Sequence, residues 1–128
     1  MYSQIVIYYI HVMPEGPEAS FITQYIKERF EQKTLTNINI IKGRYVNHGP
    51  PINFDAFAKH LPLKCLKVEK KGKVVFIYFD KDWCLISKLG MSGWWYCPGN
   101  EPDWKPVSAN IVLQFKDKEL IFSDFRNY

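Results

Sequence analysis

The N-terminal half of the chain contains two stretches in which apolar positions recur at helical spacing. One apolar face consists of Phe21, Ile22, Tyr25, Ile26 and Phe30. Residues three and four apart lie on one side of an α-helix, so this spacing predicts a helix over residues 15–31. Pro17 suits its first turn, and Glu15 and Glu18 complement the positive end of the helix dipole. A second, short helix is predicted over Phe54–His60.

After Lys33 the pattern changes to short, mostly alternating runs rich in Ile, Val and Phe. The predicted strands are Asn37–Lys42, Cys65–Lys70, Val74–Phe79, Cys84–Leu89, Asn110–Phe115 and Glu119–Ser123. Turn signals such as Asp80-Lys81-Asp82 and Lys116-Asp117-Lys118 separate them. Many short strands joined by tight turns favour an α+β fold, in which a long N-terminal helix and a second short helix pack against an antiparallel β-sandwich or barrel.

The first dozen residues contain an apolar run, Ile5 to Ile10, that has two interpretations. The run is too short to span a membrane. A signal peptide does not fit either, because no Lys or Arg precedes the run and no small-residue cleavage site follows it. The run is therefore either an extra strand or sequence upstream of a true translation start at Met13. Abundant Ile, Lys, Asn, Tyr and Phe hint at an AT-rich gene, which favours the second interpretation.

Composition limits the class of protein only broadly. At 128 residues the chain has the size of one domain, and 47% apolar and 16% aromatic residues exclude a disordered protein. The net charge of +4 permits an anionic partner without requiring one. Five lysines within ten positions indicate either a solvated face or a phosphate-contacting surface. They are Lys64, Lys67, Lys70, Lys71 and Lys73.

Cysteines and histidines give no sign of a cofactor. The three cysteines, Cys65, Cys84 and Cys97, are odd in number and have no C-x-x-C spacing. A disulfide framework or a zinc site is therefore not expected, and we expect an intracellular, reducing compartment. The three histidines are too scattered to fit a metal-ligand spacing.

The most specific signal is the hexapeptide Met13-Pro14-Glu15-Gly16-Pro17-Glu18. Three further blocks follow it in order: Lys71-Gly72-Lys73, Leu89-Gly90-Met91-Ser92-Gly93 and Ser123-Asp124-Phe125-Arg126-Asn127-Tyr128. Together they resemble the N-terminal catalytic domain of the Fpg/Nei DNA glycosylases, and the hexapeptide resembles the Nei-like branch. The resemblance covers 13–128 and leaves 1–12 as an extension.

The resemblance implies a bifunctional DNA glycosylase/AP lyase that removes oxidised bases in base excision repair. The nitrogen of Pro14 would attack C1′ of the damaged nucleotide, expel the base and form a Schiff base, after which elimination would nick the strand. Glu15 matches the acid/base carboxylate that assists opening of the sugar ring, and Glu18 matches a second carboxylate near the lesion. Lys73 matches a lysine that contacts a DNA phosphate and supports catalysis.

The resemblance also implies how the DNA is held. Met91, Arg126 and Tyr128 match residues that fill the gap left when the damaged nucleotide is flipped out of the duplex. The implied partner is double-stranded DNA that contains damaged bases or abasic sites. The protein is expected to act as a monomer and to have no membrane partner. Taken singly, each candidate also has a structural explanation: a helix-start proline, a dipole-complementing carboxylate, a solvated lysine or a core methionine.

Two departures from the family pattern bear on activity. Twelve residues precede Met13, so if translation starts at Met1 the nitrogen of Pro14 is a tertiary amide without a lone pair to offer, whereas initiation at Met13 and removal of the methionine would free it. The family's helix–two-turn–helix and zinc-finger parts lie beyond Tyr128, and zinc is implied only there. The alternative function is therefore a catalytically silent DNA-binding remnant.

A third hypothesis needs no family resemblance. Four aromatic residues cluster near a proline-rich turn and would serve as stacking platforms in a single-strand-binding β-barrel. They are Trp94, Trp95, Tyr96 and Trp104. Core and loop packing is the competing explanation.

Overall fold

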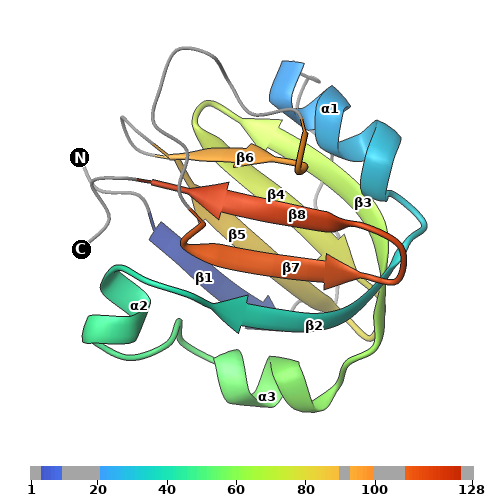
Figure 1. Ribbon diagram of the computed structural model, residues 1–128. Helices are drawn as coiled ribbons and strands as arrows, with labels where there is room; N and C mark the ends of the chain where they lie inside the picture. The colour runs from blue at the N-terminus through green and yellow to red at the C-terminus, as the bar shows by residue number, and fades with distance from the viewer. Residues whose placement is uncertain (1–3, 10–20, 90–92, 100–108, 125–128) are drawn as a thin grey trace.

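A computed structural model describes residues 4–9, 21–89, 93–99 and 109–124 (Figure 1). Within these ranges the helices are α1 (Phe21–Phe30), α2 (Arg44–Asn47) and α3 (Phe54–Lys59). The strands are β1 (Gln4–Tyr9), β2 (Thr34–Ile40), β3 (Leu63–Lys71), β4 (Val74–Phe79), β5 (Trp83–Lys88), β6 (Trp94–Tyr96), β7 (Ile111–Phe115) and β8 (Glu119–Ser123).

The strands form two antiparallel layers that face each other. Their hydrogen-bonded order is β1-β5-β4-β3-β2-β7-β8-β6. In Figure 1 the layer that lies behind consists of β1, β5, β4 and β3, and the layer in front consists of β2, β7, β8 and β6. Only the pairs Thr34↔Lys64 and Leu35↔Leu63 join β2 to β3, so the sheet turns from one layer to the other at this point. The sequence-based prediction of an antiparallel sandwich is confirmed.

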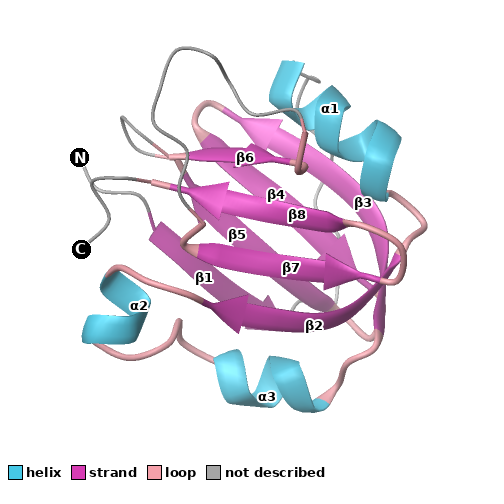
Figure 2. Ribbon diagram, in the orientation of Figure 1, coloured by secondary structure: helices cyan, strands magenta, loops and turns pink. Residues whose placement is uncertain are grey.

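The core fills the space between the two layers and reaches the helices at the rim. Ile77 and Leu85 from one layer and Leu113 and Phe122 from the other are buried, as alternation on a sheet with one inner face requires. Helix α1 lies beside β3, α2 lies beyond the C-terminal end of β2, and α3 lies below β2 (Figure 2). The α1 side chain Phe30 lies with its ring centroid 4.7 Å from that of Phe115.

The helix predictions fare differently. The short helix predicted over Phe54–His60 is found as α3, with His60 as its C-terminal cap. The long N-terminal helix is not borne out, because α1 spans ten residues and residues 15–20 lie outside the described ranges. At the other end, Gln32 has a left-handed φ of 70° and donates its N–H to the carbonyl of Cys65 at 2.7 Å. This bond directs the chain into β2 instead of a further helical turn.

The strand predictions are accurate where turn residues bound a short apolar run. Strands β4 and β8 have the predicted bounds, and β3, β5 and β7 differ from the predictions by one or two residues at one or both ends. The strand predicted over Asn37–Lys42 is β2, which begins three residues earlier and ends two residues earlier. The three-residue β6 and the four-residue α2 were not predicted. Of the apolar run near the N-terminus, residues 4–9 form β1, which pairs with β5 along its whole length. Among the described residues, no helix is both long and apolar enough for a membrane span.

Candidate functional site

Lys73 is the one candidate residue for which the described ranges provide geometry. Pro14, Glu15, Glu18, Met91, Arg126 and Tyr128 lie outside those ranges. The blocks that contain Lys73, Met91 and Arg126 can nevertheless be located from the residues at their described ends.

Lys73 lies at the tip of the hairpin between β3 and β4. The turn depends on Gly72, whose φ of +60° is a left-handed conformation that side-chain-bearing residues rarely adopt. Lys73 is exposed, and its carbonyl accepts the N–H of Leu89 at 2.9 Å. The hairpin is thereby fastened to the segment that follows β5.

The segment that leaves β5 is fixed at both ends. Leu89 is buried, and its carbonyl accepts the N–H of Gly93 at 2.9 Å. A Cβ on Gly93 would lie 2.3 Å from that oxygen, so no larger residue fits without a backbone shift. The glycine at the end of the Leu89–Gly93 block therefore has a packing reason to be there.

The last block begins where β8 ends, beside the same segment. Trp94 of β6 pairs with Ser123 of β8. Asp124 is buried and donates its N–H to the side-chain oxygen of Asn110 at 2.9 Å, and Asn110 donates its own N–H to Phe122 at 2.9 Å. Figure 1 shows the start of β6 and the end of β8 at the same edge of the sandwich.

These contacts bring three of the four sequence blocks to one end of the molecule. Lys73 is bonded to Leu89, Leu89 to Gly93, and the residue after Gly93 pairs with Ser123. Blocks that are separated by tens of residues in sequence are thus connected by direct backbone contacts. The fourth block, Met13–Glu18, lies outside the described ranges.

The lysine-rich stretch is not one patch, because β3 separates its members. Lys64 lies near the start of this nine-residue strand, about 23 Å from Lys71 at its end. Lys67 forms an ion pair with the buried Glu69. Only the last lysines remain at the hairpin tip.

The hairpin tip gains a further cation from a neighbouring strand. Lys71 and Lys88 both pair with Val74, so the two side chains occupy one row on one face of the sheet. Lys71, Lys73 and Lys88, which we call the hairpin lysines, are all exposed. Three exposed cations near one end of a sheet favour binding of a polyanion.

The cysteines do not take part in this site. Cys65, Cys84 and Cys97 are all buried and free. Burial raises the pKa of the Cys65 and Cys84 thiols to about 12, and the charges of Glu31 and Glu69 respectively add to the rise. Thiols of this kind are neutral and unreactive near neutral pH. Within the described residues, no group of three or more His, Cys, Asp or Glu side chains is placed to hold a metal ion.

The stacking-platform hypothesis is wrong for two of its four residues. Trp95 is 1% exposed and donates its indole N–H to the Ser87 hydroxyl at 3.0 Å, which links the two layers. Tyr96 is buried as well. Trp104 lies outside the described ranges. Rings in the core cannot stack on bases, so core packing explains Trp95 and Tyr96.

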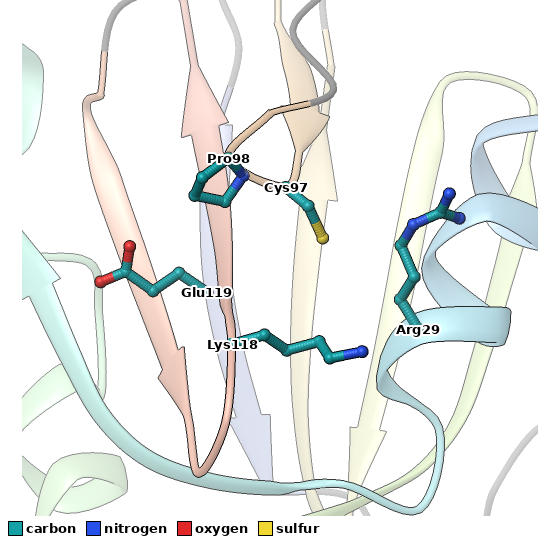
Figure 3. A pocket seen from close by; sticks show the side chains of 5 residues that line it. All are labelled: Arg29, Cys97, Pro98, Lys118 and Glu119. Atoms are coloured by element: carbon teal, nitrogen blue, oxygen red, sulfur yellow. The ribbon is translucent and has the colours of Figure 1, made fainter.

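A hollow of about 380 Å³ lies elsewhere on the sandwich, and sequence analysis did not single it out. Arg29, Cys97, Pro98, Lys118 and Glu119 line it (Figure 3). Figure 3 shows Lys118 extending toward the side of Arg29, while Glu119 points away. The Arg29 guanidinium is held 3.9 Å above the Tyr25 ring. The hollow adjoins the start of β8, about 13 Å along this strand from Ser123, and none of the described candidate residues lines it.

The fold and the converging blocks define a β-sandwich with a basic end. Residues 13–128 match the family model for the formamidopyrimidine-DNA glycosylase N-terminal domain. The chain therefore belongs to the formamidopyrimidine-DNA glycosylase (Fpg/Nei) family, as the sequence blocks indicated. Its assignment to the Nei-like branch stays a prediction.

Similar proteins are known from bacteria. The chain is 28% identical over 120 residues to the formamidopyrimidine-DNA glycosylase of Wolbachia pipientis, a match that covers 91% of this chain and 42% of the relative. It is 26% identical over 121 residues to the enzyme of the same name from Ligilactobacillus salivarius, with 91% and 41% covered. The chain thus spans about two fifths of the length of these curated relatives.

Solved structures share the fold at lower identity. One is the Lactococcus lactis formamidopyrimidine-DNA glycosylase bound non-covalently to DNA that contains an AP site. It matches with a TM-score of 0.65 and 21% identity over 84% of this chain and 40% of that one. A MutM structure in complex with DNA that contains carbocyclic 8-oxo-G matches with the same TM-score and identity, over 84% and 39%.

Proposed function

We propose that this chain is the catalytic domain of a bifunctional DNA glycosylase/AP lyase that removes oxidised bases from double-stranded DNA and nicks the strand. The observation that carries the proposal is the convergence of three family blocks beside the hairpin lysines. The relatives carry the same enzyme name, and two solved relatives are bound to damaged or abasic DNA.

In the proposed reaction, Pro14 is the nucleophile once its nitrogen is a free secondary amine. The nitrogen forms a bond to C1′ while the bond from C1′ to the base breaks, and the base leaves with the bonding electrons and a proton. Glu15 gives a proton to the ring oxygen as the sugar opens, and an iminium forms between Pro14 and C1′. Loss of a proton from C2′ then expels the 3′ phosphate, and a second elimination expels the 5′ phosphate. Glu18 is the second carboxylate near the lesion.

DNA binding is assigned to two groups of residues. Lys73 contacts a backbone phosphate next to the lesion, with Lys71 and Lys88 adding charge from the same end of the sheet. Met91, Arg126 and Tyr128 occupy the gap left by the flipped nucleotide. The ends of their segments are held by Leu89, Gly93 and Asp124. We expect fixed segment ends to reduce the entropy lost when such wedge residues are ordered on DNA.

A second candidate function is DNA binding without chemistry. While a residue precedes Pro14, its nitrogen is an amide and no Schiff base can form. The observation that favours this form is β1, since residues 4–9 pair with β5 and bury Ile5 and Ile7. Binding through the hairpin lysines does not depend on the state of the Pro14 nitrogen.

Borohydride trapping on abasic duplex DNA separates the two functions. The test compares a chain that begins at Pro14, obtained by initiation at Met13 and methionine removal, with the chain of residues 1–128. We expect covalent trapping of the first, loss of trapping in its Pro14→Gly variant, and binding without trapping for the second. Equal trapping of both chains would show that Pro14 is not the nucleophile.

A further inference from the structure

Strand β1 is held by three separate parts of the chain. It pairs with β5 from Gln4↔Lys88 to Tyr9↔Trp83. Tyr45 of α2 accepts the Ile5 N–H at 2.6 Å and lies 3.2 Å from the Ile5 carbonyl, to which its hydroxyl donates. The Asn53 side-chain amide donates to the Ile7 carbonyl at 2.8 Å. These bonds link residues 40 and 46 positions apart in the sequence.

Both edges of the β1 backbone are therefore occupied. In an antiparallel pair, the backbone groups of alternate residues point toward the partner strand and away from it. The groups of Ile5 and Ile7 that bind Tyr45 and Asn53 point away from β5. A sheet edge normally leaves such groups open to water or to another chain. Here two side chains satisfy three of them, which fixes the register of the strand.

The side chains of β1 add burial to these hydrogen bonds. Ile5 is 2% exposed and Ile7 is not exposed at all, so both belong to the core between the layers. They are two positions apart and point to the same face, whereas Val6 between them is only partly buried. The groove formed by β5, Tyr45 and Asn53, in which β1 lies, thus selects an extended segment with bulky aliphatic residues at alternate positions.

The two polar side chains of the groove, Tyr45 and Asn53, both form hydrogen bonds to the backbone of β1. Burial raises the pKa of the Tyr45 phenol, which keeps it neutral and able both to donate and to accept. Asn53 precedes α3 in a left-handed conformation with a φ of 68°, which asparagine tolerates better than most residues. Its side chain does not cap α3 and is directed to Ile7 instead.

We propose that the groove formed by β5, Tyr45 and Asn53 is a strand-binding site, that its occupant is residues 4–9 of this chain, and that these contacts hold the strand without its covalent link to Pro14. Recognition of this kind adds a strand to a sheet through main-chain hydrogen bonds, with pockets for alternate side chains. The site explains why Ile5 and Ile7 belong to the same core as α1 and β4.

The direction of β1 determines how far its covalent link to Pro14 can reach. Because Gln4 pairs with Lys88 and Tyr9 with Trp83, β1 runs away from the hairpin lysines. Five residues lead from Tyr9 to Pro14, and five extended residues span at most about 18 Å. This is close to the length of β5, about 17 Å from end to end. With β1 in its groove, the link therefore limits how Pro14 can approach Lys73.

The catalytic consequence of this site rests on the proposed function. Hydrolysis of the Met13–Pro14 bond adds OH from water to the Met13 carbonyl and H to the Pro14 nitrogen, which becomes a secondary amine. A strand held by contacts alone stays in its groove after this step. The core is then complete and the nucleophile is free in the same molecule.

Hydrogen exchange on the intact chain is the first test. We expect the amides of Ile5, Val6 and Tyr8 to exchange at least about 100-fold more slowly than in an unstructured peptide. Tyr45→Phe removes the acceptor for Ile5 and should speed exchange at residues 5–7 about tenfold, while exchange in β7 stays unchanged. Exchange of β1 at unstructured rates in the intact chain would overturn the proposal.

Cutting the folded chain tests whether contacts alone hold the strand. A protease site replaces residues 10–13 in the full chain, and the protein is cut after purification. We expect the N-terminal fragment to co-elute with the remainder at micromolar concentration. Asn53→Asp, which removes the amide donor, should weaken retention at least tenfold. Asn47→Asp makes the same change at an exposed position of α2 and should leave retention unchanged.

The failures are distinguishable. A fragment that separates on cutting, or a remainder that unfolds, would overturn the strand-binding site whatever the DNA chemistry. Absence of borohydride trapping in a chain that begins at Pro14 and has the peptide of residues 1–12 bound would instead contradict the lyase function and leave the strand-binding site standing.

Discussion

The long edge of β5 and its Lys88 end differ in what they contribute to the protein. Along its side, β5 holds β1 with buried isoleucines and a satisfied backbone edge. At its Lys88 end, the same strand leads to exposed lysines, a left-handed glycine and a glycine packed on a carbonyl. The first region gains free energy from burial, and the second presents charge in a fixed place. Changes in the first should therefore alter folding, and changes in the second should alter binding.

The largest expected effect is a charge placed in the β1 groove. Ile7→Asp buries a carboxylate without a partner where Ile7 now fills the core. We expect a loss of about 4 kcal/mol in the free energy of unfolding, from the removed aliphatic group and the desolvated charge. Urea denaturation measures it. Ile52→Asp, at a position 72% exposed, should cost less than about 0.5 kcal/mol. Equal effects would show that β1 does not contribute to the core.

The next effect comes from the buried thiols at alkaline pH. Burial raises the pKa of Cys65 and Cys84 to about 12, above the ordinary value of 9.0. The unfolded chain then loses protons first, so the stability that the neutral thiols confer is complete below pH 9 and declines as the pH rises toward 12. Between pH 9 and 10 we expect the free energy of unfolding to fall by up to about 1.4 kcal/mol per thiol. Urea denaturation at pH 8 and pH 10 measures the loss. Cys65→Ala and Cys84→Ala should each remove the part of this loss that comes from one thiol. A pH dependence that is unchanged in both variants would contradict this origin.

Cys84 also reports on β1 directly, because it pairs with Tyr8 across the two strands. We expect iodoacetamide at pH 8 to leave both thiols unmodified in the intact protein. In a chain without residues 1–12, Cys84 should react while Cys65, which pairs with Phe79 away from β1, stays protected. Mass spectrometry of the labelled peptides distinguishes the two. Protection of Cys84 in both chains would mean that β1 does not cover it.

The sequence predicted the layers better than the contacts between distant segments. Strands β4 and β8 are short apolar runs that end at turn residues such as Asp80 and Asp117, so their bounds could be predicted. Strand β6 has three residues, too few for a periodic signal, and it exists because it pairs with β8. The bond between Tyr45 and Ile5 spans 40 positions and leaves no local pattern. The lysine-rich stretch looked like one patch because sequence spacing ignores that a strand extends by about 3.3 Å per residue.

The candidate site was predictable only as a set of motifs. The family blocks identified Lys73 as a phosphate-contacting lysine, whereas its position at a hairpin tip and its contact with the segment after β5 come from the structure. Lys88 directly precedes the Leu89–Gly93 block, which indicated a positive charge near the DNA. Its place in one row with Lys71, on the other side of Val74, follows only from the strand pairing. The hollow beside Arg29 and Lys118 combines residues from α1 and from the start of β8, which no sequence spacing relates.

A smaller effect is expected where a glycine shapes the functional end. Gly93→Ala places a Cβ 2.3 Å from the Leu89 carbonyl, so the backbone must shift. We expect a loss of about 2 kcal/mol in stability and weaker binding to abasic duplex DNA, because the Leu89–Gly93 segment no longer keeps its end points. Denaturation and fluorescence anisotropy measure the two effects. A variant with unchanged stability and unchanged affinity would show that this close contact is relaxed without cost.

The smallest effect is the one most specific to the functional end. Lys73→Ala should change stability by less than about 0.5 kcal/mol, because the side chain is exposed and the bond to Leu89 uses the backbone carbonyl. We expect about a tenfold loss of affinity for abasic duplex DNA at low salt, and a decrease of about 1 in the slope of log affinity against log salt concentration, as one lost phosphate contact predicts. Lys64→Ala removes the same charge near the far end of β3 and should leave the slope unchanged. If both variants lower affinity equally, the lysines act through net charge alone, and the hairpin tip has no special place in DNA binding.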